Sequence, residues 1–184
     1  MNKGLISVRY ATALLQFAQN ENAEDEMYAQ AKFLSRVFLQ VSNLHTILNN
    51  PMVPKERKRQ VILLAAGDKV PEVFEKTVEL LLTNNREDCL QSIMLEYQEQ
   101  YRKSKNILRG KLTTAVEIDD PTTQKLIASI EGKVRGNLEL EKTVDPNILG
   151  GFILEVDFIR WDASLTGQLN RIKKQYIERN RRIV

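Results

Sequence analysis

The spacing of apolar residues changes close to Lys105, and this change constrains the fold more than any other feature of the sequence. Before that point, apolar residues recur every three or four positions over long stretches, which is the period of an amphipathic helix. After it, residues 107–118 contain β-branched side chains in partial alternation, which is typical of a strand. The sequence therefore predicts a mainly α protein with two domains, a helical one over residues 1–105 and a small α/β one over residues 106–184.

Helices are predicted over most of the N-terminal half. Their ranges are about 4–20, 24–41, 72–83 and 87–105, with one further helix that begins at Pro54. The second range opens with three consecutive acidic residues, and negative charge interacts favourably with the N-terminal end of the helix dipole. Between residue 41 and Pro54 the sequence shows only short apolar pieces, and Pro51 and Pro54 mark a break.

The C-terminal half is predicted to mix strands and helices. After the strand at 107–118, a helix is predicted to follow Asp119 and Asp120; its apolar face would carry Leu126, Ile127, Ile130 and Val134. The apolar runs LELEKTV and FILEVDF flank DPNILGG, whose turn-forming residues and short length predict two neighbouring antiparallel strands. A last helix is predicted from about residue 165, with Ser164 as its N-terminal cap.

The composition is that of an ordinary soluble globular protein, with 42% hydrophobic and 28% charged residues. The formal net charge of +3 gives no bulk argument for nucleic-acid binding. Cys89 is the only cysteine, so the chain has neither an internal disulfide framework nor a cysteine-clustered zinc site. The N-terminal stretch has neither a signal-peptide core nor an apolar run long enough to span a bilayer, so we expect another component to hold the protein at any membrane.

The glycine pair Gly150-Gly151 is the first candidate for a binding site, because glycine-rich loops can cradle phosphates. Such a loop requires a following helix and a fixed spacing, whereas this pair precedes the strand-like run FILEVDF. We therefore interpret the pair as a turn into a strand with tight backbone packing. Asp157, Asp162 and Ser164 offer oxygen ligands, but Asp162 and Ser164 before an apolar helical stripe are first a capping signal.

No catalytic centre can be assembled from the remaining residues. His45 is the only histidine and has no nucleophile with an oriented partner nearby, and Cys89 follows acidic residues that disfavour a thiolate. The basic runs PKERKR and RIKKQYIERNRRIV are interpreted as solvated faces, since nucleic-acid binders usually present a larger basic footprint. The residues alone therefore predict a two-domain interaction protein without a catalytic residue, a metal or a cofactor.

Several motifs, taken in order, resemble one known family over essentially the whole chain. RYATALLQFA is similar to that family's Arg-Tyr-Ala helix, and NPMVPKERKRQVI to its proline-bounded helix start. The most specific similarity runs from LELEKTV through DPNILGGFILE to Asp162, Ser164 and Leu169. Asp157 departs from it, because the family usually has Gly or Asn there. On these motifs the chain resembles the delta subunit of F-type ATP synthase, the relative of the mitochondrial oligomycin-sensitivity-conferring protein.

The resemblance implies a six-helix N-terminal bundle, a small α/β C-terminal domain and a non-catalytic role without a cofactor. In that family the subunit belongs to the stator and joins the catalytic head to the peripheral stalk, so that the head resists rotor torque during ATP synthesis. The bundle binds the N-terminal helix of an alpha subunit between its first and fifth helices, and the C-terminal domain meets the b-type stalk subunits. Carried over residue by residue, the alpha-subunit site would comprise Tyr10, Ala13, Leu14, Phe17, Val78, Leu81 and Leu82.

Further expectations follow from the same resemblance. The partners would be the alpha subunit and the b-type stalk subunits, with no small-molecule substrate and no nucleic acid. The protein would lie peripherally on the cytoplasmic face of a bacterial cell membrane, held there through the complex. On the residue-level argument given above, Gly150, Gly151, Asp162 and Ser164 would serve as a structural turn and cap. The alternative function, which the basic runs and the all-helical first half suggest instead, is an RNA-binding helical module, and it predicts an affinity for RNA that falls steeply with salt.

Overall fold

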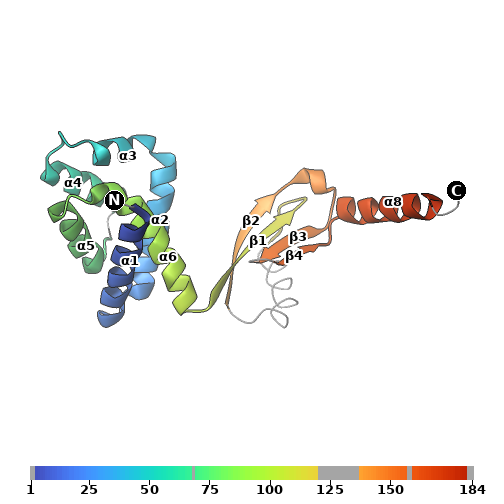
Figure 1. Ribbon diagram of the computed structural model, residues 1–184, viewed down its shortest axis with the longest axis horizontal. Coiled ribbons are helices and arrows are strands. Elements are labelled where there is room, and N and C mark those ends of the chain that lie inside the picture. Colours follow the sequence, from blue (N-terminus) through green and yellow to red (C-terminus); the bar gives the residue numbers. More distant parts are fainter. Residues whose placement is uncertain (1–2, 68, 120–136, 157–158, 182–184) are drawn as a thin grey trace. The chain divides into compact units, whose positions relative to one another are not determined.

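The computed structural model describes residues 3–67, 69–119, 137–156 and 159–181. Over these residues the fold is mainly helical and includes a small four-stranded sheet (Figure 1). The chain divides into two compact units, Met1–Lys105 and Asn106–Val184, at the position where the apolar spacing changes. None of the helices in the described ranges is long and apolar enough to cross a membrane. The helix predicted after Asp120 and the residue Asp157 lie outside the described residues.

The first unit is built from helices. Their bounds are α1 (Lys3–Asn20), α2 (Glu24–Gln40), α3 (Ser42–Asn49), α4 (Lys55–Ala66), α5 (Glu72–Thr83), the 3₁₀-helix η1 (Glu87–Cys89) and α6 (Leu90–Ser104). The sequence analysis assigned no element between residue 41 and Pro54, whereas in the structure α3 occupies this stretch and buries Leu44 and Leu48, one turn apart. A helix of 8 residues contains too few apolar positions to show a period in the sequence.

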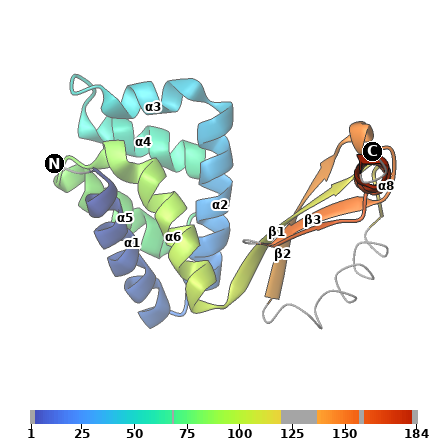
Figure 2. The same ribbon diagram turned by 45° about the vertical axis from the view of Figure 1, so that its right-hand side comes forward.

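α6 provides the centre of the core of this unit. It packs against α1 and α2 and lies between them in Figure 2. Its buried apolar side chains follow the helical period and are Leu90, Ile93, Met94, Tyr97 and Tyr101. Because burying one large apolar side chain stabilises a fold by roughly 1.5–3 kcal/mol, this stripe accounts for much of the attachment of α6.

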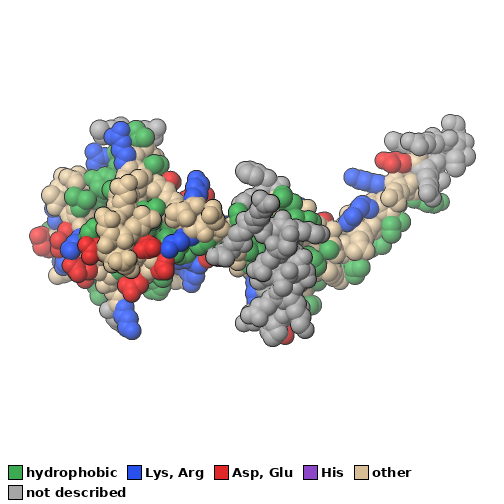
Figure 3. Space-filling view, turned by 90° about the horizontal axis from the view of Figure 1, so that it is seen from below, with side chains coloured by type: hydrophobic (Ala, Val, Ile, Leu, Met, Phe, Trp, Pro, Cys, Tyr) green, Lys and Arg blue, Asp and Glu red, His purple; other side chains and the backbone are tan. Residues whose placement is uncertain are grey.

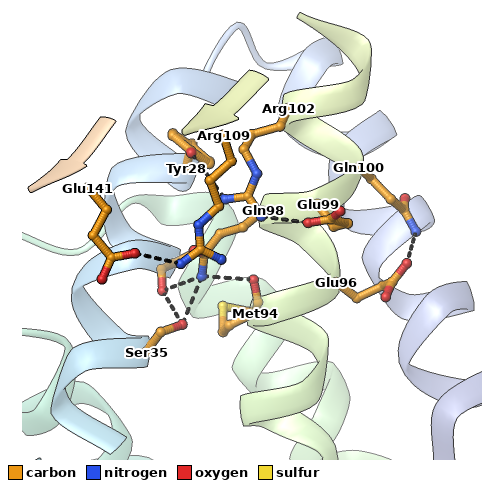
Figure 4. A network of polar contacts seen from close by, with 11 residues as sticks. Tyr28, Ser35, Met94, Glu96, Gln98, Glu99, Gln100, Arg102, Arg109 and Glu141 are labelled. Atoms are coloured by element: carbon orange, nitrogen blue, oxygen red, sulfur yellow. Dashed lines mark hydrogen bonds and ion pairs between the residues drawn. The ribbon is translucent and has the colours of Figure 1, made fainter. Parts of the chain in front are cut away.

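One polar side chain, that of Gln98, is buried within that stripe, and its amide nitrogen is hydrogen-bonded. The Gln98 amide nitrogen lies 3.0 Å from the Ala31 carbonyl oxygen, 2.8 Å from Ser35 Oγ and 3.2 Å from the Met94 carbonyl oxygen (Figure 4). Because a buried amide without partners would be costly, these contacts favour one register of α6 against α2. The same figure includes an ion pair of the second unit, in which Arg109 lies 3.0 Å from Glu141.

The C-terminal end of α6 is attached to the N-terminal end of α2. The Tyr101 hydroxyl donates to Asp25 Oδ1 at 2.6 Å, and the Tyr101 ring stacks on Tyr28 with centroids 4.2 Å apart. Lys105 Nζ lies 3.1 Å from Glu24 Oε1. The hydrogen bond from Tyr101 holds the pKa of Asp25 below its usual value. Paired charges and stacked rings therefore secure the last turn of the first unit.

The second unit contains a four-stranded sheet and a C-terminal helix. Its elements are β1 (Ile107–Thr114), β2 (Asn137–Val144), the 3₁₀-helix η2 (Pro146–Ile148), β3 (Phe152–Val156), β4 (Ile159–Asp162) and α8 (Leu165–Arg181). The strand order is β2-β1-β3-β4; β1 pairs in parallel with β2, and the other pairs are antiparallel. The apolar core is formed by Leu112, Leu154 and Val156, with Leu138, Phe152 and Trp161 packed against them.

The prediction that the runs LELEKTV and FILEVDF form neighbouring strands was wrong. β1 lies between β2 and β3 and pairs with both. The connecting segment passes the end of β1, where the Asp145 amide donates to the Thr114 carbonyl oxygen at 2.8 Å. Because β1 is central, Leu112 is buried on the same sheet as the buried Leu154. A hairpin of the two predicted strands alone would not bury these side chains.

Candidate functional site

The predicted partner-binding residues of α1 follow one stripe of the helix. Leu14 is buried in the core, whereas Tyr10 and Phe17 are half-buried and Ala13 is exposed. Tyr10, Ala13 and Phe17 are spaced three and four positions apart, so they lie on neighbouring turns of one face. These three residues form the accessible edge of the stripe.

The predicted residues of α5 have a different environment. Val78 and Leu81 are 1% exposed and Leu82 is 5% exposed. All three pack inside the first unit, as Leu14 does, and leave no surface free for a partner in this conformation. Their contribution in this structure is to hold the helices together from within.

Two contacts join the accessible edge of α1 to α5. The Asn84 side-chain nitrogen donates to the Tyr10 hydroxyl oxygen at 3.1 Å, and Lys76 Nζ lies 5.7 Å from the centroid of the Phe17 ring. The second distance suits a cation–π contact. Leu80 is one helical turn from both Lys76 and Asn84, so it lies between the two contacts. We call Tyr10, Ala13, Phe17, Lys76, Leu80 and Asn84 the α1/α5 seam.

The sequence analysis missed Lys76, Leu80 and Asn84, and of these Leu80 is the apolar residue of the seam. Its side chain is 51% exposed, although both neighbouring leucines are buried. The signal was present in the sequence, because three consecutive leucines at 80–82 point in directions about 100° apart and cannot all face one core. An exposed leucine beside two half-buried aromatic rings is a suitable apolar contact for a partner helix.

Lys76 is held in place by its own helix. Its ammonium lies 2.7 Å from Glu72 Oε1, one turn earlier on α5. This hydrogen bond raises the pKa of Lys76 above its usual value and holds the pKa of Glu72 below its own. Lys76 is therefore charged at neutral pH where it lies over Phe17.

A second candidate surface lies on α8. Its exposed apolar residues are Leu165, Leu169, Ile172 and Tyr176, each 49–67% exposed. They are spaced four, three and four positions apart, the pattern of a helix–helix contact seam. Figure 3 shows basic side chains on one side of α8 and apolar side chains on the other. The helix is amphipathic, and its apolar side is uncovered.

A cavity of about 750 Å³ opens beside the start of α8. Phe152 and Trp161 contribute aromatic walls to it, and Arg160, Arg171 and Lys174 contribute positive charge. The guanidinium of Arg171 donates to the Asp162 carbonyl oxygen at 2.9 Å, which fixes its position. The charge of the lining suits contact with an acidic surface.

The glycine pair and the residues after β4 form the turn and cap of the second unit. Gly151 has φ +76°, and a Cβ atom there would overlap the Ala163 carbonyl oxygen. Ser164 is buried, and its Oγ accepts a hydrogen bond at 3.0 Å from the amide of Gly167 in the first turn of α8. The Leu165 amide donates to the Gly150 carbonyl oxygen at 3.0 Å. The pair thus faces the helix start rather than a ligand.

Asp162 supports this cap. Its Oδ1 accepts from Ser164 Oγ at 2.6 Å and from the Ser164 amide at 3.0 Å. These hydrogen bonds, aided by the charges of Arg160 and Arg171, hold the pKa of Asp162 below its usual value. Gly167 is a further residue that the sequence analysis missed, since a Cβ there would lie 2.6 Å from Asp162 Oδ1. In the sequence, only the spacing of Asp162, Ser164 and Gly167 indicates that Gly167 belongs to the cap.

The other candidate residues show no reactive arrangement. His45 Nδ1 lies 2.6 Å from the Asn49 side-chain nitrogen on the exposed side of α3, and Cys89 is buried. Over the described ranges, no group of three or more His, Cys, Asp or Glu side chains could hold a metal ion. The run PKERKR was wrongly interpreted as wholly solvated, because Lys58 is buried beside Glu87. The composition of the run does not indicate which one of its basic residues will be buried.

Comparisons with known proteins agree on one family. The family described as ATP synthase delta (OSCP) subunit matches residues 6–176. ATP synthase subunit delta of Phocaeicola vulgatus is 41% identical over 182 residues, which cover 98% of this chain and 98% of the relative. ATP synthase subunit delta of Bacteroides fragilis is 40% identical over 186 residues, with both chains covered completely.

More distant proteins give the same result. ATP synthase subunit delta of Prochlorococcus marinus is 31% identical over 169 residues, which cover 91% of this chain and 92% of the relative. A chain in the structure of the Toxoplasma gondii mitochondrial ATP synthase hexamer has a similar fold, with a TM-score of 0.63 at 20% identity over 96% of this chain and 98% of that chain.

Proposed function

Because the chain belongs to the ATP synthase delta (OSCP) subunit family, we propose that its two units make two separate attachments within the stator. The chain is a non-catalytic subunit of the peripheral stalk of ATP synthase, and its partners are the alpha subunit of the catalytic head and the stalk subunits. It is a peripheral component of a membrane-bound complex. We place it on the cytoplasmic face of a bacterial membrane, because the three curated relatives named above come from bacteria.

In this proposal residues 1–105 act as one domain, a bundle of the six helices α1 to α6, and residues 106–184 act as the other. The first domain binds an amphipathic helix of the alpha subunit, and the second binds the stalk. A link that resists torque must dissociate slowly, which requires a well-packed cluster of apolar contacts rather than charges at a solvated rim.

The α1/α5 seam is the observation that carries the first attachment. Tyr10, Ala13 and Phe17 follow one face of α1, and Leu80 is exposed beside them on α5. A partner helix laid along the seam would bury these side chains on successive turns, which is the usual way an amphipathic helix is recognised. Among the residues predicted from the sequence, Leu14, Val78, Leu81 and Leu82 support the seam from beneath.

Titration of the full chain with a peptide tests this site. The peptide copies the first twenty or so residues of the alpha subunit from the same organism, and isothermal titration calorimetry measures the dissociation constant. We expect one-to-one binding, and Leu80→Asp should weaken it at least about tenfold, because a charge would replace a central apolar contact.

Leu64→Asp is the matched control, because Leu64 is 82% exposed on α4 and is not part of the seam. It should leave the affinity unchanged. Equal loss in both variants, or no binding by the unaltered chain, would exclude the seam as the alpha-subunit site.

The exposed stripe of α8 carries the second attachment. Leu165, Leu169, Ile172 and Tyr176 remain uncovered in the free chain, and their spacing suits the side of another helix. We assign this surface to the end of the b-type stalk subunits. The basic residues of α8 would then face solvent or acidic groups of the partner.

A further inference from the structure

The cavity of about 750 Å³ beside the start of α8 is used by neither proposed attachment. Its volume is within the range of ligand-binding sites. Four of its lining residues come from α8, and they are Gly167, Asn170, Arg171 and Lys174. Their spacing of three, one and three positions places them on one face of the helix, which we call the basic face of α8. This face forms one wall of the cavity, and β4 with the start of β3 forms another.

The basic face lies on the opposite side of α8 from the exposed apolar stripe. Because each residue of an α-helix turns by about 100°, the centres of the two faces are about 180° apart around the axis. Figure 3 accordingly shows basic and apolar side chains on different sides of the helix. A stalk helix laid along the stripe would therefore leave the cavity open, and a separate segment can enter it.

The charges of the described lining favour an anionic occupant. Arg160, Arg171 and Lys174 are all exposed, and Asp162 is the one acidic residue among the described lining residues. Oδ1 of that carboxylate already accepts two hydrogen bonds within the helix cap. Arg160 lies 3.4 Å from Glu155, whereas Lys174 makes no ion pair with any described residue. Carboxylates placed in the cavity therefore gain a net attraction.

The exposure of these charges and the aromatic walls favour a peptide over a small free anion. Water and salt screen exposed charges, so a single ion pair contributes little. A peptide gains more, because an apolar side chain can pack on Phe152 and Trp161 while carboxylates pair with the basic face. Arg171 is already held in position, since its guanidinium donates to the Asp162 carbonyl oxygen at 2.9 Å. We propose that the cavity binds an acidic peptide segment whose carboxylates pair with Arg171 and Lys174 and whose apolar side chain packs on Trp161.

We assign this segment to a stalk subunit. The stripe and the cavity would then hold α8 from opposite sides. The apolar stripe would slow dissociation, and the charge pairs would speed association and fix the orientation of the partner. This assignment of the source rests on the proposed function, which places the stalk on α8, whereas the acidic-peptide site itself rests on the cavity alone.

Trp161 reports directly on the cavity, because it lines the cavity and is the only tryptophan of the chain. The full chain is titrated with the capped peptide Glu-Glu-Phe-Glu-Glu and with its uncharged counterpart Gln-Gln-Phe-Gln-Gln, while tryptophan fluorescence is followed. We expect a saturable change with the acidic peptide and at least about fivefold weaker binding of the uncharged one, because only the first forms charge pairs. Equal affinities, or no change with either peptide, would overturn the proposal.

A pair of variants locates the binding on the basic face. Lys174→Glu should weaken the binding of the acidic peptide at least about fivefold, because a repulsive charge replaces an attractive one. Lys173→Glu is the matched control, since it makes the same change at the neighbouring exposed position, which is outside the described lining. It should bind the acidic peptide within about twofold of the unaltered chain, because the charge lies off the contact. Equal losses in the two variants would show a general attraction between charges and would contradict the site.

Two further titrations separate the possible occupants. If oligouridylate changed the Trp161 signal at a lower concentration than the acidic peptide, the cavity would be a nucleic-acid site and the peptide proposal would fail. If the acidic peptide binds but a C-terminal segment of the b-type stalk subunit does not, the cavity site stands and the proposed stalk attachment fails. If the stalk segment binds while the acidic and uncharged peptides are not distinguished, the stalk attachment stands and the acidic-peptide site is rejected.

Discussion

At Gly151 a single backbone angle allows the chain to enter β3 from η2. Its φ of +76° lies in the left-handed region, and the absent side chain leaves room for the Ala163 carbonyl oxygen. Gly150 is different, since a Cβ there would meet only the exposed Leu165 side chain, at 2.8 Å. The backbone conformation therefore requires glycine at position 151, whereas at position 150 glycine is only favoured by the nearby side chain.

Alanine at each position tests this difference. Gly151→Ala should lower the free energy of unfolding of the second unit by about 2 kcal/mol or more, because it combines backbone strain with an overlap against main-chain atoms. Gly150→Ala should cost clearly less, because the Leu165 side chain can move. Urea unfolding followed by the fluorescence of Trp161, the only tryptophan, measures both. Equal losses would contradict the structural explanation.

The carboxylate of Asp162 makes the same unit sensitive to acid. Its pKa in the folded chain is below the ordinary 3.8, so the bonds to Ser164 contribute stability that is fully present above that value. This stability is lost as the pH falls through the folded pKa. Between about pH 6 and pH 3, Asp162→Asn should therefore lose less unfolding free energy than the unaltered chain. Parallel pH dependences for the two proteins would exclude this role.

Among the elements, α8 is a helix whose start is fixed by the chain but whose apolar stripe is not covered by another part of the described chain. Asp162 and Ser164 fix its start, yet its apolar stripe faces outward. An exposed stripe contributes little to the stability of the free chain, so its residues can be tested with little risk to the fold.

Ile172→Asp should weaken the binding of a C-terminal segment of the b-type stalk subunit at least about tenfold, because it places a charge in the centre of the proposed contact. Its effect on thermal unfolding should be small, since Ile172 is 63% exposed. Gln175→Asp adds the same charge at an exposed position of α8 outside both the stripe and the cavity lining, and it should bind normally. Fluorescence anisotropy of the labelled segment gives both affinities, and similar losses in the two variants would place the stalk elsewhere.

For the molecule as a whole, the proposed attachments and the RNA-binding alternative predict different responses to salt. Contacts made by apolar side chains depend weakly on ionic strength, whereas phosphate contacts release counterions. Between about 50 and 300 mM salt, the affinity for the alpha-subunit peptide should change less than about threefold. Nucleic acid held by six or more phosphates would lose several orders of magnitude. The RNA-binding alternative would be favoured if a generic RNA bound more tightly than the peptide and if its affinity fell steeply with salt concentration.

Long periodic segments could be predicted from the sequence because their physics is local. α1, α2 and α5 bury one face each, and their boundaries follow from spacing and from the residues at their ends. α3 could not, because 8 residues give too few repeats. The burial of Lys58 could not be predicted either, because it depends on a distant segment that brings Glu87 beside it. For Leu80, the three consecutive leucines show that one of them must face outward, but only the packing of the helices decides which one.

The sequence by itself determined the helical and mixed halves, the change near Lys105 and the family, since period, order of motifs and turn residues are properties of the chain. Only the tertiary structure decided that β1 separates β2 from β3, because strand pairing depends on contacts between segments that are 30 residues apart for β1 and β2 and 38 to 46 residues apart for β1 and β3. It also decided which apolar residues face outward. An apolar stripe in a sequence specifies that a face will be buried, but the packing of the other helices decides whether the chain or a partner buries it.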